Sequence, residues 1–181
     1  MNNYGVLDTL DDMPSALTRL SISLPGVTPS PHPILDALWD GLGLARACGL
    51  AAASADPSEW VSRQRNADTI EYLLARELIR TNAACDQSLT LRPVTSPGEA
   101  RSTAWAATVI QTILDFTNTA QPMAHATADT ATHHDDQHHF RTSANLLGEL
   151  GACWRGERPA YQLHTTDRTS SPWWNHHPHN L

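Results

Sequence analysis

A cluster of histidines and aspartates is the main group of potential metal ligands in this sequence. Five histidines and three aspartates lie within the fifteen residues from 125 to 139, which read HATADTATHHDDQHH. Imidazole nitrogens and carboxylate oxygens are the ligands of zinc, nickel, manganese and iron sites, and histidine also titrates near neutral pH. The spacing matches no motif of a known enzyme class, so the cluster indicates a candidate divalent-metal site without naming a reaction.

Helical geometry separates the inward from the outward side chains of this cluster. When the apolar stripe of residues 140–154 faces the core, a rotation of about 100° per residue points Asp136 inward. On the same wheel, His133 and His139 lie about 60° to either side of the core direction. We therefore expect these three side chains to lie together at one end of a helical bundle.

An inward metal site needs ligands from other helices, because a carboxylate that is buried alone is costly. In an up-down-up-down bundle, the start of the last helix lies near the end of the third helix and the start of the second. The acidic residues expected there are Asp115 and Glu59. The sequence thus predicts a site for zinc, nickel, manganese or iron whose candidate ligands are His133, Asp136, His139, Asp115 and Glu59.

The same residues also fit a polar helix start. Thr132 and Asp135 form a T-x-x-D capping box, and aspartates in a first turn interact favourably with the helix dipole. His134 and His138, four residues apart, point toward solvent on the wheel. Under this interpretation the cluster is a polar helix start, and any weak metal binding by it has no function.

Residues 138–151, HHFRTSANLLGELG, resemble the last helix of DinB-type proteins, where an HH-R-G-Q opening precedes a Leu-Leu and Leu-Gly ending. The resemblance covers fourteen of 181 residues. It implies a four-helix bundle with a three-histidine metal site and, in some members, thiol-dependent transferase activity. Here Phe140 and Thr142 replace the R and Q, and Asp135 stands where the family has a histidine. Residues 57–84 contain no histidine either, so the resemblance does not extend to the activity.

Four helical segments must position the cluster, at about residues 33–53, 57–84, 96–118 and 132–156. The second and third begin with D-P-S-E and S-P-G-E, which supply a cap, a first-turn proline and a glutamate. Apolar stripes at three- and four-residue steps predict amphipathic helices. The fold class expected is all-α, a single four-helix bundle in up-down-up-down order. A break near Gly41 is the alternative to a continuous first helix.

The expected organisation is one bundle, residues 32–156, with irregular ends. Residues 1–31 are predicted to be an irregular, partly disordered arm, although their leucines also permit a short strand or a helical turn. Residues 86–95 and 120–131 are predicted connections. Residues 157–181 are predicted to form an irregular tail, in which Trp173 and Trp174 are expected either to fold back or to dock a partner.

Three acidic residues of the second segment, Asp68, Glu71 and Glu77, are similar to the magnesium-binding motifs of nucleotide pyrophosphohydrolases. They spread around the predicted helix instead of aligning on one face. We therefore interpret them as solvated surface.

Composition excludes several function classes. The net charge is −7, and the twelve basic residues, all arginine, are scattered, which disfavours nucleic-acid binding. Arginine without lysine is typical of a GC-rich bacterial genome. No run reaches the ~18 apolar residues of a membrane span, and the N-terminus lacks a signal-peptide pattern, so we expect a cytoplasmic protein without a membrane partner.

No nucleophile elbow, phosphate loop or dinucleotide fingerprint occurs. The function expected is therefore a non-enzymatic protein-interaction or regulatory module with a protein partner or a homo-oligomeric state. The alternative is a divalent-metal-binding bundle, distantly DinB-like, centred on the histidine cluster.

Overall fold

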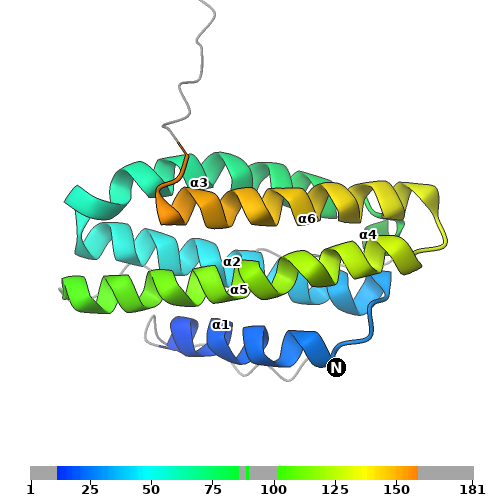
Figure 1. Ribbon diagram of the computed structural model, residues 1–181, viewed down its shortest axis with the longest axis horizontal. Coiled ribbons are helices and arrows are strands. Elements are labelled where there is room, and N and C mark those ends of the chain that lie inside the picture. The colour runs from blue at the N-terminus through cyan, green and yellow to red at the C-terminus, as the bar shows by residue number, and fades with distance from the viewer. Residues whose placement is uncertain (1–11, 86–88, 90–101, 159–181) are drawn as a thin grey trace, which may run out of the picture.

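The computed structural model describes residues 12–85, 89 and 102–158, and these residues contain helices and no β-strand. The all-α prediction is confirmed. Figure 1 shows four long helices side by side: α2 (Pro31–Ala55), α3 (Pro57–Leu78), α5 (Thr103–Thr130) and α6 (His134–Arg155). The shorter elements are α1 (Asp12–Ser23), the 3-10 turn η1 (Leu24–Gly26) and α4 (Asn82–Cys85).

The long helices pack as four neighbouring pairs: α2 with α3, α3 with α6, α6 with α5, and α5 with α2. Helix α1 packs against α2 and α5, on the side away from α3 and α6 (Figure 1). Buried leucines, isoleucines, alanines and aromatic residues from all five of these helices form one core cluster. No described helix is long and apolar enough to cross a membrane.

Helices α3 and α6 are antiparallel. Near the start of α3, Arg63 Nη1 donates to the carbonyl of Trp154, near the end of α6, at 2.9 Å. At the other end, Glu77 of α3 contacts His139 in the second turn of α6. Because α5 ends directly before α6 begins, α5 and α3 end at the same end of the molecule and run in the same direction. The predicted up-down-up-down order, which requires α3 and α5 to be antiparallel, is wrong.

Helix α2 is continuous through its glycines and extends from residue 31 to 55, two residues beyond the predicted segment at each end. The break that was the alternative near Gly41 does not occur. A Cβ atom at Gly41 would lie 2.2 Å from the ring of Phe116, so the glycine permits close approach of α5. Asp56 ends α2 and caps α3, where its side chain accepts from the backbone N–H of Glu59 at 3.4 Å.

Helix α5 differs most from its prediction. It begins at Thr103 with Ser102 as the cap and continues to Thr130, twelve residues beyond the expected end at Asn118. The predicted start at residue 96 lies outside the described residues. Residues 120–130, predicted as a connection, are helical despite Pro122 because buried small residues continue the stripe of Phe116 at four-residue spacing: Ala120, Ala124 and Ala128.

The ends of the molecule bring two further differences. Residues 12–23 of the predicted irregular arm are instead helical, in line with the alternative of a helical turn, and Leu17 and Leu20 are buried on one face of α1. At the start of α6 the cap is His133, without a side-chain capping bond, and not Thr132 as predicted. The predicted terminator Gly156 is confirmed, because it ends α6 in the left-handed conformation at a φ of 75°.

Candidate functional site

Asp136 lies in the first turn of α6 and is directed inward, as the helical wheel predicted, with 2% of its surface exposed. Its Oδ1 accepts a 2.6 Å hydrogen bond from the backbone N–H of Asn82, the first residue of α4. A backbone N–H at a helix start has no intrahelical partner, so the carboxylate satisfies it. The carboxylate of Asp136 therefore connects α6 to α4.

His139 lies one turn further along α6 and contacts the end of α3. Its Nδ1 is 2.9 Å from Oε2 of Glu77, whose side chain is only 8% exposed. The other carboxylate oxygen of Glu77 lies 3.6 Å from Arg76 and 3.7 Å from Arg80. The buried charge of Glu77 is therefore compensated from several sides, as a buried carboxylate requires.

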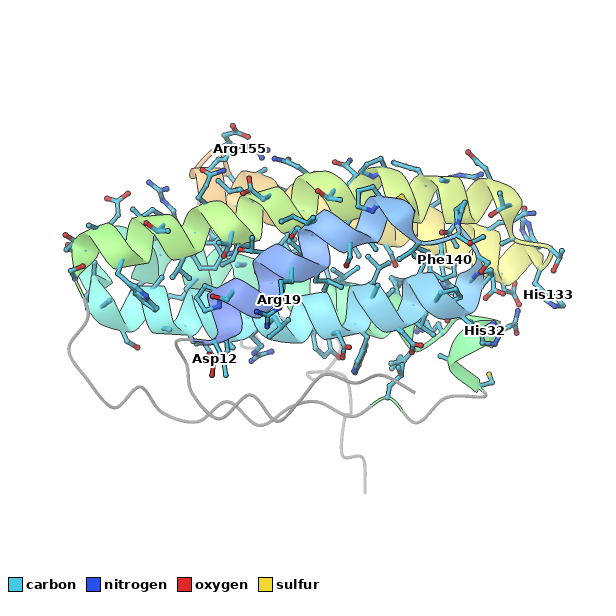
Figure 2. All side chains as sticks on the ribbon, turned by 90° about the horizontal axis from the view of Figure 1, so that it is seen from below. Asp12, Arg19, His32, His133, Phe140 and Arg155 are labelled. Carbon is cyan, nitrogen blue, oxygen red and sulfur yellow. The ribbon has the colours of Figure 1, made fainter. Side chains whose placement is uncertain are left out.

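The remaining predicted metal ligands lie apart from Asp136 and His139. Glu59 is at the opposite end of α3, where it pairs with Arg63 at 2.5 Å. Asp115 is exposed in the middle of α5 and accepts from Gln111 at 2.9 Å. His133 is exposed at the tip of the molecule (Figure 2). Of the five candidates, Asp136 is buried and His139 partly buried at the start of α6, and these two side chains contact different residues.

Glu59 lies far from Asp136 because α3 and α6 are antiparallel. Asp115 lies far from Asp136 because α5 ends later than predicted. The start of α3 lies beside the end of α6 because the two helices are antiparallel. Asp115 would lie near the start of α6 only if α5 ended at residue 118, but the helix continues to Thr130. Among the described residues, no group of three or more His, Cys, Asp or Glu side chains could hold a metal ion. Binding of a divalent metal stays a prediction.

Glu71, interpreted from the sequence as solvated surface, is instead 1% exposed, and Glu77 is 6% exposed. Neither carboxylate oxygen of Glu71 has a hydrogen-bond partner among the described residues. Burial raises the pKa of Glu71 to about 8, with a further increase from Asp68 and an opposing effect of Arg46. A signal for this burial exists in the sequence, because Glu71 lies one turn from Ala67 and from Leu74 on the apolar stripe of α3.

Further polar atoms lie in the interior between α2, α3 and α6. Gln64 Nε2 donates to Asp68 at 2.9 Å, whereas Gln64 Oε1 and Trp154 Nε1 are buried without a described partner. The two side chains meet at Gly49, where a Cβ atom would lie 2.4 Å from Trp154 Cζ2 and 2.5 Å from Gln64 Oε1. The pKa of the Cys153 thiol is raised to about 11 by burial and by Glu71. We call Gln64, Asp68, Glu71, Cys153 and Trp154 the interior cluster.

The outer face of α3 combines apolar and basic side chains. Tyr72 is 65% exposed and Ile79 is 53% exposed, and their seven-residue spacing places them on one face, two turns apart. Two exposed arginines of α3, Arg65 and Arg76, and the exposed Arg80, two residues beyond the end of the helix, accompany them. We call this set the α3 strip: Arg65, Tyr72, Arg76, Ile79 and Arg80.

The α3 strip combines three exposed arginines with two exposed apolar side chains. The chain as a whole carries a net charge of −7, so three arginines around two exposed apolar residues contrast with its average surface. Arg76 and Arg80 lie within ion-pair distance of the buried Glu77 while their side chains stay 43% and 54% exposed. Part of their hydrogen-bonding capacity therefore faces solvent.

Comparison with known proteins finds no matching family model, no similar curated protein and no similar solved structure.

Proposed function

We propose that this protein is a non-enzymatic interaction module whose α3 strip binds a partner segment that carries acidic and apolar side chains. The observation that carries the proposal is the exposure of Tyr72 and Ile79 on one helix face among arginines. Tyrosine and arginine are enriched at binding hot spots. Exposed apolar side chains gathered on one face are also a feature of interaction sites.

The charges of the strip specify the partner. Arg65, Arg76 and Arg80 favour carboxylates, and arginine binds them with paired donors in a fixed geometry. The two-turn spacing of Tyr72 and Ile79 fits an amphipathic helix laid along α3, with apolar anchors at matching intervals. A second copy of this acidic chain is a less complementary partner, because like net charges oppose association.

The packing of the other candidate residues supports a binding module over an enzyme. Asp136 and His139 contact Asn82 and Glu77, contacts that join α6 to α4 and α3. Four members of the interior cluster, Gln64, Glu71, Cys153 and Trp154, are buried between three helices, and Asp68 is partly exposed. The α3 strip, in contrast, is accessible on the surface without any movement of the helices.

A labelled synthetic peptide tests the proposal. The peptide places leucines along one helical face with glutamates around them, and binding to the full chain is measured by fluorescence anisotropy. We expect Tyr72→Ala and Ile79→Ala each to weaken binding about tenfold, which corresponds to about 1.4 kcal/mol. Arg76→Gln should weaken binding and reduce its salt dependence, because it removes a charged contact.

The controls are residues of similar type outside the strip. Ile22 of α1 is 76% exposed, and Ile22→Ala should leave binding unchanged. Arg141 of α6 pairs with Asp129, and Arg141→Gln should behave likewise. Equal binding of a scrambled peptide would contradict the proposal. A concentration-dependent dimer in sedimentation experiments that Tyr72→Ala abolishes would also contradict it, because the strip would then bind a second copy of the chain.

A further inference from the structure

Among the described residues, Glu71 is a buried carboxyl group whose surroundings are poorly suited to a charge. The residue is 1% exposed at the interface of α3 with α2 and α6, and neither of its buried carboxyl oxygens has a hydrogen-bond partner among the described residues. An ionised carboxylate in such a place loses its hydration without replacement. A protonated carboxyl is neutral and loses much less.

The neighbouring groups on each packed element leave the charge of Glu71 uncompensated. On α3, Asp68 lies one turn away and adds a charge of the same sign, and the Gln64 amide donates to Asp68. From α2, Arg46 attracts the carboxylate, but Arg46 is itself exposed, where solvent weakens the attraction. From α6, the facing titratable group is the thiol of Cys153, which supplies no positive charge in any protonation state.

We propose that Glu71 is a proton-controlled packing element, which holds α3 against α2 and α6 while it is protonated and loosens this interface when it releases its proton to solvent. Only the carboxyl O–H bond breaks in this step, and the proton passes to water or buffer. This inference goes beyond the binding role of the α3 strip and does not depend on it. The stability of the folded protein should depend on pH, because burial makes Glu71 harder to ionise.

The direction in which stability changes with pH follows from the difference between the pKa of Glu71 in the unfolded chain and in the folded protein. In the unfolded chain Glu71 ionises at its ordinary pKa of 4.5, and in the folded protein its pKa is about 8. Between these values the folded protein holds a proton that the unfolded chain has released, so the free energy of unfolding falls as pH rises. The stabilisation is complete below the pKa of the unfolded chain, and it is lost as pH increases through the pKa of the folded protein.

The experiment measures the melting temperature of the reduced full chain between about pH 7 and about pH 9, a range above the ordinary pKa of histidine. We expect the wild type to lose about 3–5 °C over this range. Glu71→Gln, which is neutral at every pH, should lose much less. The matched control is Glu157→Gln at the exposed end of α6, which should keep the wild-type dependence.

A second measurement does not depend on how well Glu71→Gln folds. Infrared spectroscopy of the wild type should show a protonated carboxyl band that disappears with a midpoint near pH 8. Asp68→Asn should move this midpoint to lower pH, because it removes the neighbouring negative charge. The proposal is overturned if Glu71→Gln keeps the wild-type loss in melting temperature, or if no protonated carboxyl is present near pH 7.

Discussion

The side chain of Asp136 joins two segments that are 54 residues apart, through a 2.6 Å hydrogen bond from the backbone N–H of Asn82 to its Oδ1 atom. The bond connects the first turn of α6 to the first residue of α4, at the end of the molecule where α5 turns into α6. It assigns a structural role to the central residue of the predicted metal site.

The Asp136 bond can be tested by stability measurements. Asp136→Ala should lower the free energy of unfolding by about 1–3 kcal/mol, because it leaves a backbone N–H of α4 without its charged acceptor. The measurement is urea denaturation followed by circular dichroism. The control is Asp135→Ala, next to it in the same helix turn but exposed, for which we expect a loss below about 1 kcal/mol. Equal losses in the two variants would contradict the assignment.

The contact between His139 and Glu77 should contribute to stability as a pair. Single variants His139→Ala and Glu77→Gln and the double variant together form a cycle that isolates the interaction. We expect a coupling free energy of about 0.5–3 kcal/mol, because the two side chains are in direct hydrogen-bond contact at 2.9 Å. Strictly additive losses would show that the contact contributes nothing.

Two glycines of α2 provide a matched pair of variants. At Gly49 a Cβ atom would lie 2.4 Å from Trp154 Cζ2, so Gly49→Ala should cost about 1–3 kcal/mol through forced repacking. At Gly43 no atom lies within 4 Å of such a Cβ, so Gly43→Ala should instead stabilise by up to about 1 kcal/mol. Chemical denaturation measures both changes. A stabilising Gly49→Ala would mean that α2 does not approach Trp154 so closely.

Elemental analysis of tag-free protein tests the metal prediction. We expect well under one equivalent of zinc, nickel, manganese or iron, because Asp136 and His139 already contact Asn82 and Glu77. The variants His133→Ala and His139→Ala are measured beside the wild type. One equivalent of metal in the wild type that is lost in both variants would instead establish a metal site at the start of α6.

Features that depend on a few neighbouring residues could be predicted from the sequence. The start of α3 after Asp56, the end of α6 at Gly156 and the inward direction of Asp136 follow from capping, backbone conformation and helical period. These effects act within one or two turns, so they are the same in any tertiary arrangement. The all-helical class follows for the same reason, because apolar stripes recur at three- and four-residue steps along most of the chain.

Features that depend on distant segments could not be predicted from the sequence. Three such features require packing partners far away in the sequence: the packing of α1 against α2 and α5, the continuation of α5 to Thr130, and the parallel direction of α3 and α5. The separation of Glu59 from Asp136 follows from that direction. The burial of Glu71 also arises there, because a charged residue on a mostly apolar stripe is enclosed only when two other helices cover it.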